Sequence, residues 1–139
     1  MTLTARTLTL TILPERFAIL RFVPDAKVPA WAEQGTLFSV TRTRDELSII
    51  CEENNVPPSV AAQKGWRSLQ VHGPFALNEV GVLSTLASAL AAAGVSILAV
   101  STFDTDYLFV AGEQLHAAIS ALTGAGHTIH GRESVRGNV

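Results

Sequence analysis

The stretch NEVGVLSTLASALAAAGVSILAVSTFDTDYLFVA, residues 78–111, decides the fold. Its first half carries an apolar stripe at the spacing of one helix face, formed by Leu83, Leu86, Ala87 and Leu90. Asn78 precedes this stripe and can cap a helix, and Gly94 follows it where a left-handed C-terminal residue is expected. The pattern therefore predicts one helix between Asn78 and Gly94.

The second half of the same stretch predicts a hairpin. Two apolar runs, residues 95–100 and 107–111, have the length of strands. Asp104-Thr105 lies between them, and polar turn formers between two apolar runs are typical of a tight connection. We therefore expect two antiparallel strands joined by a short turn.

The flanking sequence extends this order. A strand candidate, residues 66–72, precedes the helix, and helical spacing returns at Leu115, Ala118, Ile119 and Leu122 before it ends at Gly124. Residues 127–131 then supply a last edge strand. The order strand, helix, strand, strand, helix, strand is that of a ferredoxin-like unit, an antiparallel sheet with both helices on one face.

The N-terminal half repeats the arrangement in reduced form. It has four strand candidates, residues 8–12, 17–23, 36–41 and 46–51, with room for single helical turns near Trp31 and after Asn54. The predicted fold class is therefore α+β, with two tandem ferredoxin-like units, the first with shortened helices. We expect the first unit in residues 1–65, the second in residues 66–131, and a flexible tail in residues 132–139.

Composition excludes several classes of function. The net charge is −2 and no basic run occurs, which argues against a nucleic-acid surface. The apolar tracts are shorter than the ~20 residues that a membrane helix needs. One cysteine, Cys51, and no recognisable leader predict a cytoplasmic protein without an internal disulfide.

The junction before the helix, residues 75–82, is the first candidate site. The unpaired N–H groups and positive dipole end of a helix N-terminus attract an anion such as a carboxylate. Gly81 lets a ligand approach closely, and the Glu79 carboxylate could receive an ammonium group. The residues alone favour a plainer interpretation, in which Asn78 and Glu79 cap the helix and Gly81 permits tight packing.

The hairpin turn is the second candidate. Asp104 and Asp106 occupy alternate positions and point to the same side, where they could hold a positively charged group, although aspartate is also a common turn former. The turn lies near the helix N-terminus only if the strand register brings it there.

Other reactive residues predict no catalytic or metal centre. His127-x-x-His130 has no third ligand nearby, and Cys51 follows two isoleucines as a small buried residue does. No G-x-S-x-G, P-loop or G-x-G-x-x-G motif occurs. We therefore expect no catalytic residue, no metal and no cofactor.

Two long motifs carry a family resemblance. Residues 77–122, with VGVL at 80–83, AAAGVSI at 91–97 and STFDTDYLFV at 101–110, resemble an ACT domain, the regulatory module that binds amino acids in many metabolic enzymes. The first half, with PAWA at 29–32, SVTRTRDELSIIC at 39–51 and GWR at 65–67, extends the likeness to small stand-alone bacterial proteins with two tandem ACT-like units. That group is similar to the ACT units of aspartate kinases and to eukaryotic cytosolic arginine sensors.

The resemblance implies a site and a function. In those relatives the ligand lies at an interface between ACT units, which implicates Glu79, Val80, Gly81, Thr102, Phe103 and Asp106 here. We expect a non-enzymatic regulatory protein that binds a small molecule, an amino acid first of all, and acts as a homodimer or on a regulated partner protein. The alternative is a ligand-free module for protein–protein interaction.

Overall fold

The computed structural model describes residues 6–131 and divides the chain into two compact units. Unit 1 joins the segment up to Pro14 to the chain from Arg67 onward, and unit 2 is Glu15–Trp66. This division differs from the expected boundary at residue 65, because the N-terminal strand lies in unit 1. The predicted tail, residues 132–139, lies outside the described residues.

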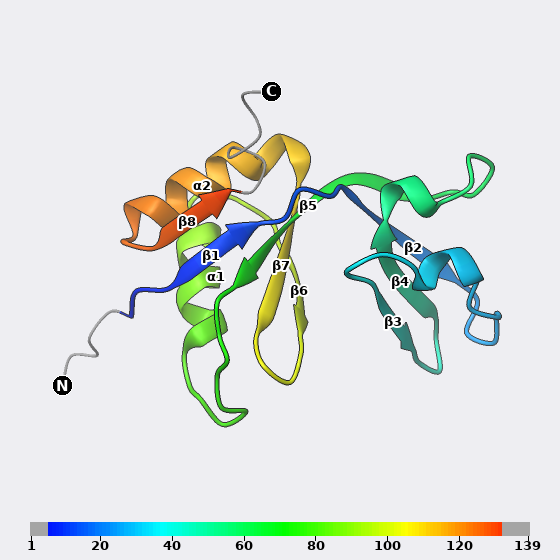
Figure 1. Ribbon diagram of the computed structural model, residues 1–139, viewed down its shortest axis with the longest axis horizontal. Helices are drawn as coiled ribbons and strands as arrows, with labels where there is room; N and C mark the ends of the chain where they lie inside the picture. Colours follow the sequence, from blue (N-terminus) through cyan, green and yellow to red (C-terminus); the bar gives the residue numbers. More distant parts are fainter. Residues whose placement is uncertain (1–5, 132–139) are drawn as a thin grey trace. The chain divides into compact units, whose positions relative to one another are not determined.

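Unit 1 is a five-stranded sheet covered by two helices (Figure 1). Its strands lie in the order β6, β7, β5, β1, β8. Their bounds are β1 Thr9–Ile12, β5 Gln63–Val71, β6 Leu98–Ser101, β7 Asp106–Ala111 and β8 Thr128–Gly131. The helices are α1 Val82–Ala92 and α2 Leu115–Gly124, the latter preceded by a single 3-10 turn, η3 Gly112–Gln114.

Strand β1 lies between the two strands that a simple ferredoxin-like unit would pair directly. Leu10 is opposite Val71 in the antiparallel pair with β5 and opposite Ile129 in the parallel pair with β8. The β1–β8 pair is therefore an exception to the expected antiparallel sheet. Leu10 and Ile12 lie in the hydrophobic core, as their spacing predicts, but Thr11 on the opposite face is buried as well. Period-two spacing specifies a face but not a neighbouring strand.

The helices bury the predicted stripe against the sheet. Leu86 and Leu90 of α1 and Leu122 of α2 are fully buried, in one cluster with Leu10, Leu69, Val71, Leu108 and Val110. Gly94, at φ 75°, ends α1 in the left-handed conformation, and the N–H of Val95 donates to the carbonyl of Leu90, as expected of a C-terminal cap. Within residues 6–131, neither helix is long and apolar enough to cross a bilayer.

The start of α1 corrects one prediction. Asn78 does not cap this helix, which begins after Gly81 at φ 92° and has no side-chain cap among the described residues. The reason is local, because Asn78 lies in a turn in which the N–H of Glu79 donates to the carbonyl of Ala76 at 3.0 Å, before the first helical residue, Val82.

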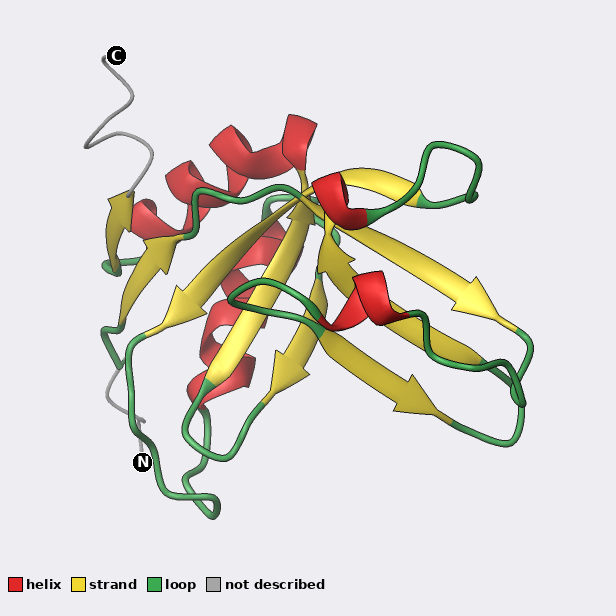
Figure 2. Cartoon of the chain, turned by 45° about the vertical axis from the view of Figure 1, so that its right-hand side comes forward, coloured by secondary structure: helices red, strands yellow, loops and turns green. Residues whose placement is uncertain are grey.

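Unit 2 has the same succession of elements with single 3-10 turns in place of helices, as predicted (Figure 2). Its elements are β2 Phe17–Phe22, η1 Ala30–Glu33, β3 Ser39–Arg42, β4 Leu47–Glu52, η2 Glu53–Asn55 and the first part of β5. The strand order β3, β4, β2, β5 is that of a ferredoxin-like sheet. Cys51 is buried in the core of this unit beside Leu47 and Ile49, and burial raises the pKa of its thiol, with a smaller contribution from Glu52.

Candidate functional site

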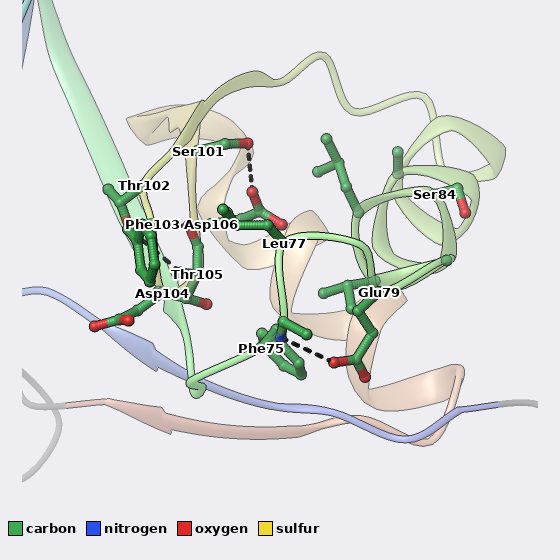
Figure 3. A pocket seen from close by; sticks show the side chains of 15 residues that line it. Phe75, Leu77, Glu79, Ser84, Ser101, Thr102, Phe103, Asp104, Thr105 and Asp106 are labelled. Atoms are coloured by element: carbon green, nitrogen blue, oxygen red, sulfur yellow. Dashed lines mark hydrogen bonds between the residues drawn. The ribbon is translucent and has the colours of Figure 1, made fainter.

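A cavity of about 580 Å³ opens in unit 1 where three segments meet (Figure 3). One wall is the segment from Phe75 to Gly81, the second is the first half of α1, and the third is the β6–β7 turn. In Figure 3 the turn with Phe103 and Asp104 lies on one side and the helix with Ser84 on the other, with Leu77 between them. The strand register thus brings the two candidate segments together.

A backbone hydrogen bond joins the two loops at the base of the cavity. The N–H of Phe75 donates to the carbonyl of Asp104 at 2.8 Å. Gly73 lies against the same carbonyl, and a Cβ there would be 2.8 Å from the Asp104 oxygen and 3.2 Å from the Phe75 nitrogen. Because real Cβ atoms do not approach backbone this closely, glycine at position 73 is a requirement of the site.

The hairpin turn is held by its own threonines. The N–H of Thr102 donates to the carbonyl of Thr105 at 2.7 Å, and the N–H of Thr105 donates to Thr102 Oγ1 at 3.2 Å. Thr105 Oγ1 donates to the carbonyl of Val71 in β5 at 2.7 Å. Ser101 Oγ donates to the carboxylate of Asp106, which fixes that carboxylate at the cavity wall.

The N-terminus of α1 faces the cavity. Gly81, Val82, Leu83 and Ser84 all line it. The first intrahelical bond runs from the N–H of Thr85 to the carbonyl of Gly81 at 3.0 Å, so the N–H groups before Thr85 have no partner within the helix. This arrangement can accept a small anion without any cationic side chain.

Glu79 already has a partner. Arg6 donates to its carboxylate, and the N–H of Ala76 donates to the other carboxylate oxygen at 3.3 Å. The hydrogen bond from Arg6 lowers the pKa of Glu79, and the bond from Ala76 acts in the same direction. The Arg6 guanidinium also lies over the Phe75 ring, 5.6 Å from its centre. Glu79 therefore stabilises the loop through these contacts. Because its carboxylate is already paired, its predicted role as the partner of a ligand ammonium is weakened.

Of the six residues predicted for the site, five line the cavity: Glu79, Gly81, Thr102, Phe103 and Asp106. Val80 does not, and its side chain is 87% exposed. A ligand-binding role for any of them stays a prediction. Phe75, Leu77 and Ser101 also line the cavity and lie within or beside the two candidate segments. The residues that the prediction missed are Ser84 and Ala87, which could have been found by following the helix for two further turns.

The charged residues that line the cavity are all acidic within the part of the chain that the structure describes. They are Glu79, Asp104 and Asp106. Since Arg6 neutralises Glu79, Asp104 and Asp106 are left to offer negative charge. The cavity thus combines two carboxylates, several hydroxyl groups, an apolar wall and a helix N-terminus.

Family comparison agrees with this fold. Residues 61–124 match the model of the ACT domain, and residues 15–59 match a model that describes an N-terminal domain. A protein of Agobacterium tumefaciens with a crystal structure is 38% identical, with 92% of this chain and 96% of that chain covered and a TM-score of 0.86. The chain belongs to the ACT-domain family.

Two further solved structures share the fold. One is a Vibrio cholerae protein of unknown function, described as a possible transport protein, with 15% identity, coverage of 86% of this chain and 90% of that chain, and a TM-score of 0.69. The other is the ligand-free regulatory subunit of aspartate kinase from Thermus thermophilus, with 11% identity, coverage of 84% and 96%, and a TM-score of 0.56. At these identities both bear on the fold alone. Among curated proteins, none matches this chain.

Proposed function

We propose that the chain is a cytoplasmic, non-catalytic regulatory protein that binds an amino acid in the cavity of unit 1. The observation that carries this proposal is the position of an uncapped helix N-terminus opposite two carboxylates that no basic side chain of the described residues neutralises within the cavity. An amino acid presents one anionic and one cationic group a few ångströms apart, and the cavity offers a complement to each.

Each end of the ligand has a distinct set of partners in this proposal. The α-carboxylate lies at the first turn of α1 and accepts from the N–H groups of Val82 and Leu83. The α-ammonium lies at Asp106, whose carboxylate is held by Ser101, with Asp104 close by. Glu79 takes no part in this contact, because its carboxylate is paired with Arg6.

In this proposal, regulation follows from the ligand's contact with both loops. The segment before α1 and the β6–β7 turn are joined by the Phe75–Asp104 backbone bond, and a ligand between them adds contacts that exist only when the loops are closed. A ligand shifts a conformational equilibrium only through such differential contacts.

A second candidate function, binding of a partner protein, has its own observation. Leu77 and Phe103, which line the cavity, are 72% and 76% exposed, and Val80, next to the lining residues in sequence, is 87% exposed. Large exposed apolar side chains close together are typical of contact surfaces. In this proposal the rim takes an ACT unit of a second copy or a regulated protein, which closes the open side of the cavity. Light scattering with and without ligand tests it, since a mass that never departs from the monomer excludes the homodimer.

A thermal-shift screen with each of the twenty common amino acids tests the leading proposal. At about a hundredfold its dissociation constant, a ligand stabilises the folded chain by about 2.7 kcal/mol. Asp106→Asn keeps the shape of the side chain and removes its charge, so it should weaken the response about tenfold or more. Asp45→Asn, at an exposed position of unit 2, is the matched control and should leave the response unchanged. A flat response to all twenty contradicts the proposal.

A further inference from the structure

The cavity of unit 1 has a large apolar lining in addition to its carboxylates and its helix N-terminus. Phe75 and Leu83 belong to this lining and pack against the hydrophobic core of unit 1, which holds their side chains in place. Leu77 and Phe103 also line the cavity, but they remain exposed to water. In Figure 3, Phe103 lies on the β6–β7 turn and Leu77 lies between this turn and the helix. The cavity thus has two anchored apolar side chains and two that nothing within unit 1 covers.

An apolar group bound in this cavity would remove Leu77 and Phe103 from water. Burial of apolar surface is favourable roughly in proportion to the area removed from water, and here the surfaces of both ligand and protein contribute. The cavity volume of about 580 Å³ is that of an ordinary small-molecule site and exceeds what glycine or alanine would fill. Size and lining therefore both favour a large apolar side chain.

The charged groups of the cavity select against an acidic side chain. Glu79, Asp104 and Asp106 line the cavity, and no lysine, arginine or histidine among residues 6–131 does. A side-chain carboxylate of the ligand would lose water without gaining a cationic partner, and it would face carboxylates of the same sign. Aspartate and glutamate are therefore poor ligands.

A basic side chain gains little in the same place. If the α-ammonium of the ligand pairs with Asp106, a second cation is left with Asp104. Asp104 is exposed in the β6–β7 turn, and ion pairs between exposed, flexible groups contribute little. A cation beside Leu77 and Phe103 also loses part of its hydration, which is unfavourable without a close partner. The apolar lining therefore decides the preference.

We propose that the ligand is an amino acid with a large apolar side chain, such as leucine, methionine or phenylalanine. This inference rests on the proposed function, from which it takes the positions of the α-carboxylate and the α-ammonium. The side chain of the ligand lies among Phe75, Leu77, Leu83 and Phe103, and Leu77 and Phe103 determine the specificity because the ligand covers them. Each further methylene group that is buried should raise the affinity about fourfold.

Calorimetric titration of the full-length chain with matched pairs of amino acids tests this preference. Norleucine and lysine have the same side-chain carbon atoms and differ by a terminal ammonium, and leucine and asparagine have nearly the same shape. Norleucine should bind about tenfold more tightly than lysine or better, and leucine should exceed asparagine by a similar factor. Equal or reversed affinities in either pair overturn the inference.

The titrations also separate this inference from the proposed function. If lysine or asparagine binds more tightly than its partner, and Asp106→Asn abolishes that binding, the proposed function stands and the apolar preference is wrong. If none of the amino acids binds, both are wrong.

Two variants locate the side-chain contact. Leu77→Ser and Phe103→Ser change exposed residues, so the chain should still fold, and each should weaken leucine binding about tenfold while the lower affinity for alanine changes little. Val23→Ser, at an exposed apolar residue of unit 2, is the matched control and should leave leucine binding unchanged. Leucine binding that survives both substitutions overturns the inference. So does a change of mass by light scattering in Phe103→Ser with unchanged leucine binding, because Phe103 would then contact a partner protein.

Discussion

Arg6 donates a hydrogen bond to the carboxylate of Glu79, 73 positions further along the chain. The same guanidinium lies over the ring of Phe75, so one side chain contacts both ends of the loop that forms a cavity wall. The segment just before β1 is thereby connected to the wall of the cavity. Because of this contact, Glu79, which was predicted to bind a ligand ammonium, is better described as a residue that stabilises the loop.

Removing Arg6 should loosen that loop without unfolding the chain. Arg6→Ala should increase amide hydrogen exchange at Ala76, whose N–H donates to the released Glu79 carboxylate. The free energy of unfolding should change little, because exposed ion pairs contribute little to stability. Mass-spectrometric exchange over residues 75–80 checks this. Arg44→Ala, an exposed arginine of unit 2, should leave exchange in this loop as it is, and equal exchange in wild type and Arg6→Ala would contradict the expectation.

Stability should depend on pH through His127. Its Nδ1 accepts the N–H of Leu8 at 3.0 Å, and burial lowers the pKa of the ring. The unfolded chain therefore binds the proton more readily, with a pKa of about 6.5. Above that value both states are neutral at His127, and stability is full. As the pH falls through about 6.5 and toward the lowered folded pKa, the unfolded state takes up more protons and stability decreases.

Urea unfolding of wild type and His127→Gln between pH 8 and pH 5 measures this effect. The wild type should lose more stability than the variant over this range, because glutamine does not titrate. The other histidines are present in both chains, so the difference between the two curves isolates His127. Parallel curves for wild type and His127→Gln would rule the assignment out.

Two glycines offer a matched test of the helix ends. Gly94 has φ 75°, and an added Cβ would contact nothing within 4 Å. Gly94→Ala should therefore lower the free energy of unfolding only by the cost of placing alanine in the left-handed region, about 1–2 kcal/mol. Gly124 is in α2, outside the positive-φ region, and is equally open. Gly124→Ala should therefore be neutral or stabilise by up to about 1 kcal/mol. Denaturant unfolding should show a lower free energy of unfolding for Gly94→Ala and an unchanged or higher one for Gly124→Ala. Equal changes in the two variants would contradict this account of the α1 cap.

The position of β1 predicts how a fragment behaves. Residues 66–131 alone lack the strand between β5 and β8, together with Leu8, Leu10 and Ile12 of the core. This fragment should show no cooperative thermal unfolding by circular dichroism. The same fragment with residues 6–14 attached after Gly131 through a flexible linker should regain a cooperative transition. Cooperative unfolding of the bare fragment would support the originally expected boundary at residue 65.

Much of the fold follows from local pattern. The stripe with Leu86 and Leu90 and the cap at Gly94 specify α1, and the paired apolar runs specify β6 and β7. The neighbours of β1 do not follow, because alternation of Leu10 and Ile12 with Thr11 fixes a buried face and leaves the pairing open. Asn78 is a good capping residue, but it lies in a turn that closes at Glu79, and the helix begins only after Gly81.

The candidate site was predictable as two separate segments. Their meeting depends on the bond from Phe75 to Asp104 and on the close approach of Gly73, and neither leaves a pattern in the sequence. The contact of Arg6 with Glu79 could not be predicted from the sequence either. The chain has many possible pairs of opposite charge, and only the fold shows that these two residues, 73 positions apart, are in contact.

Amide chemical shifts of the ¹⁵N-labelled full chain, recorded with each of the twenty amino acids, test the central claim most directly. The account predicts that at least one amino acid shifts the amides of Val82, Leu83 and Asp106 in a saturable way, and that Asp106→Asn abolishes the change. An absence of shifts with all twenty, or saturable shifts confined to residues outside the cavity, would contradict it.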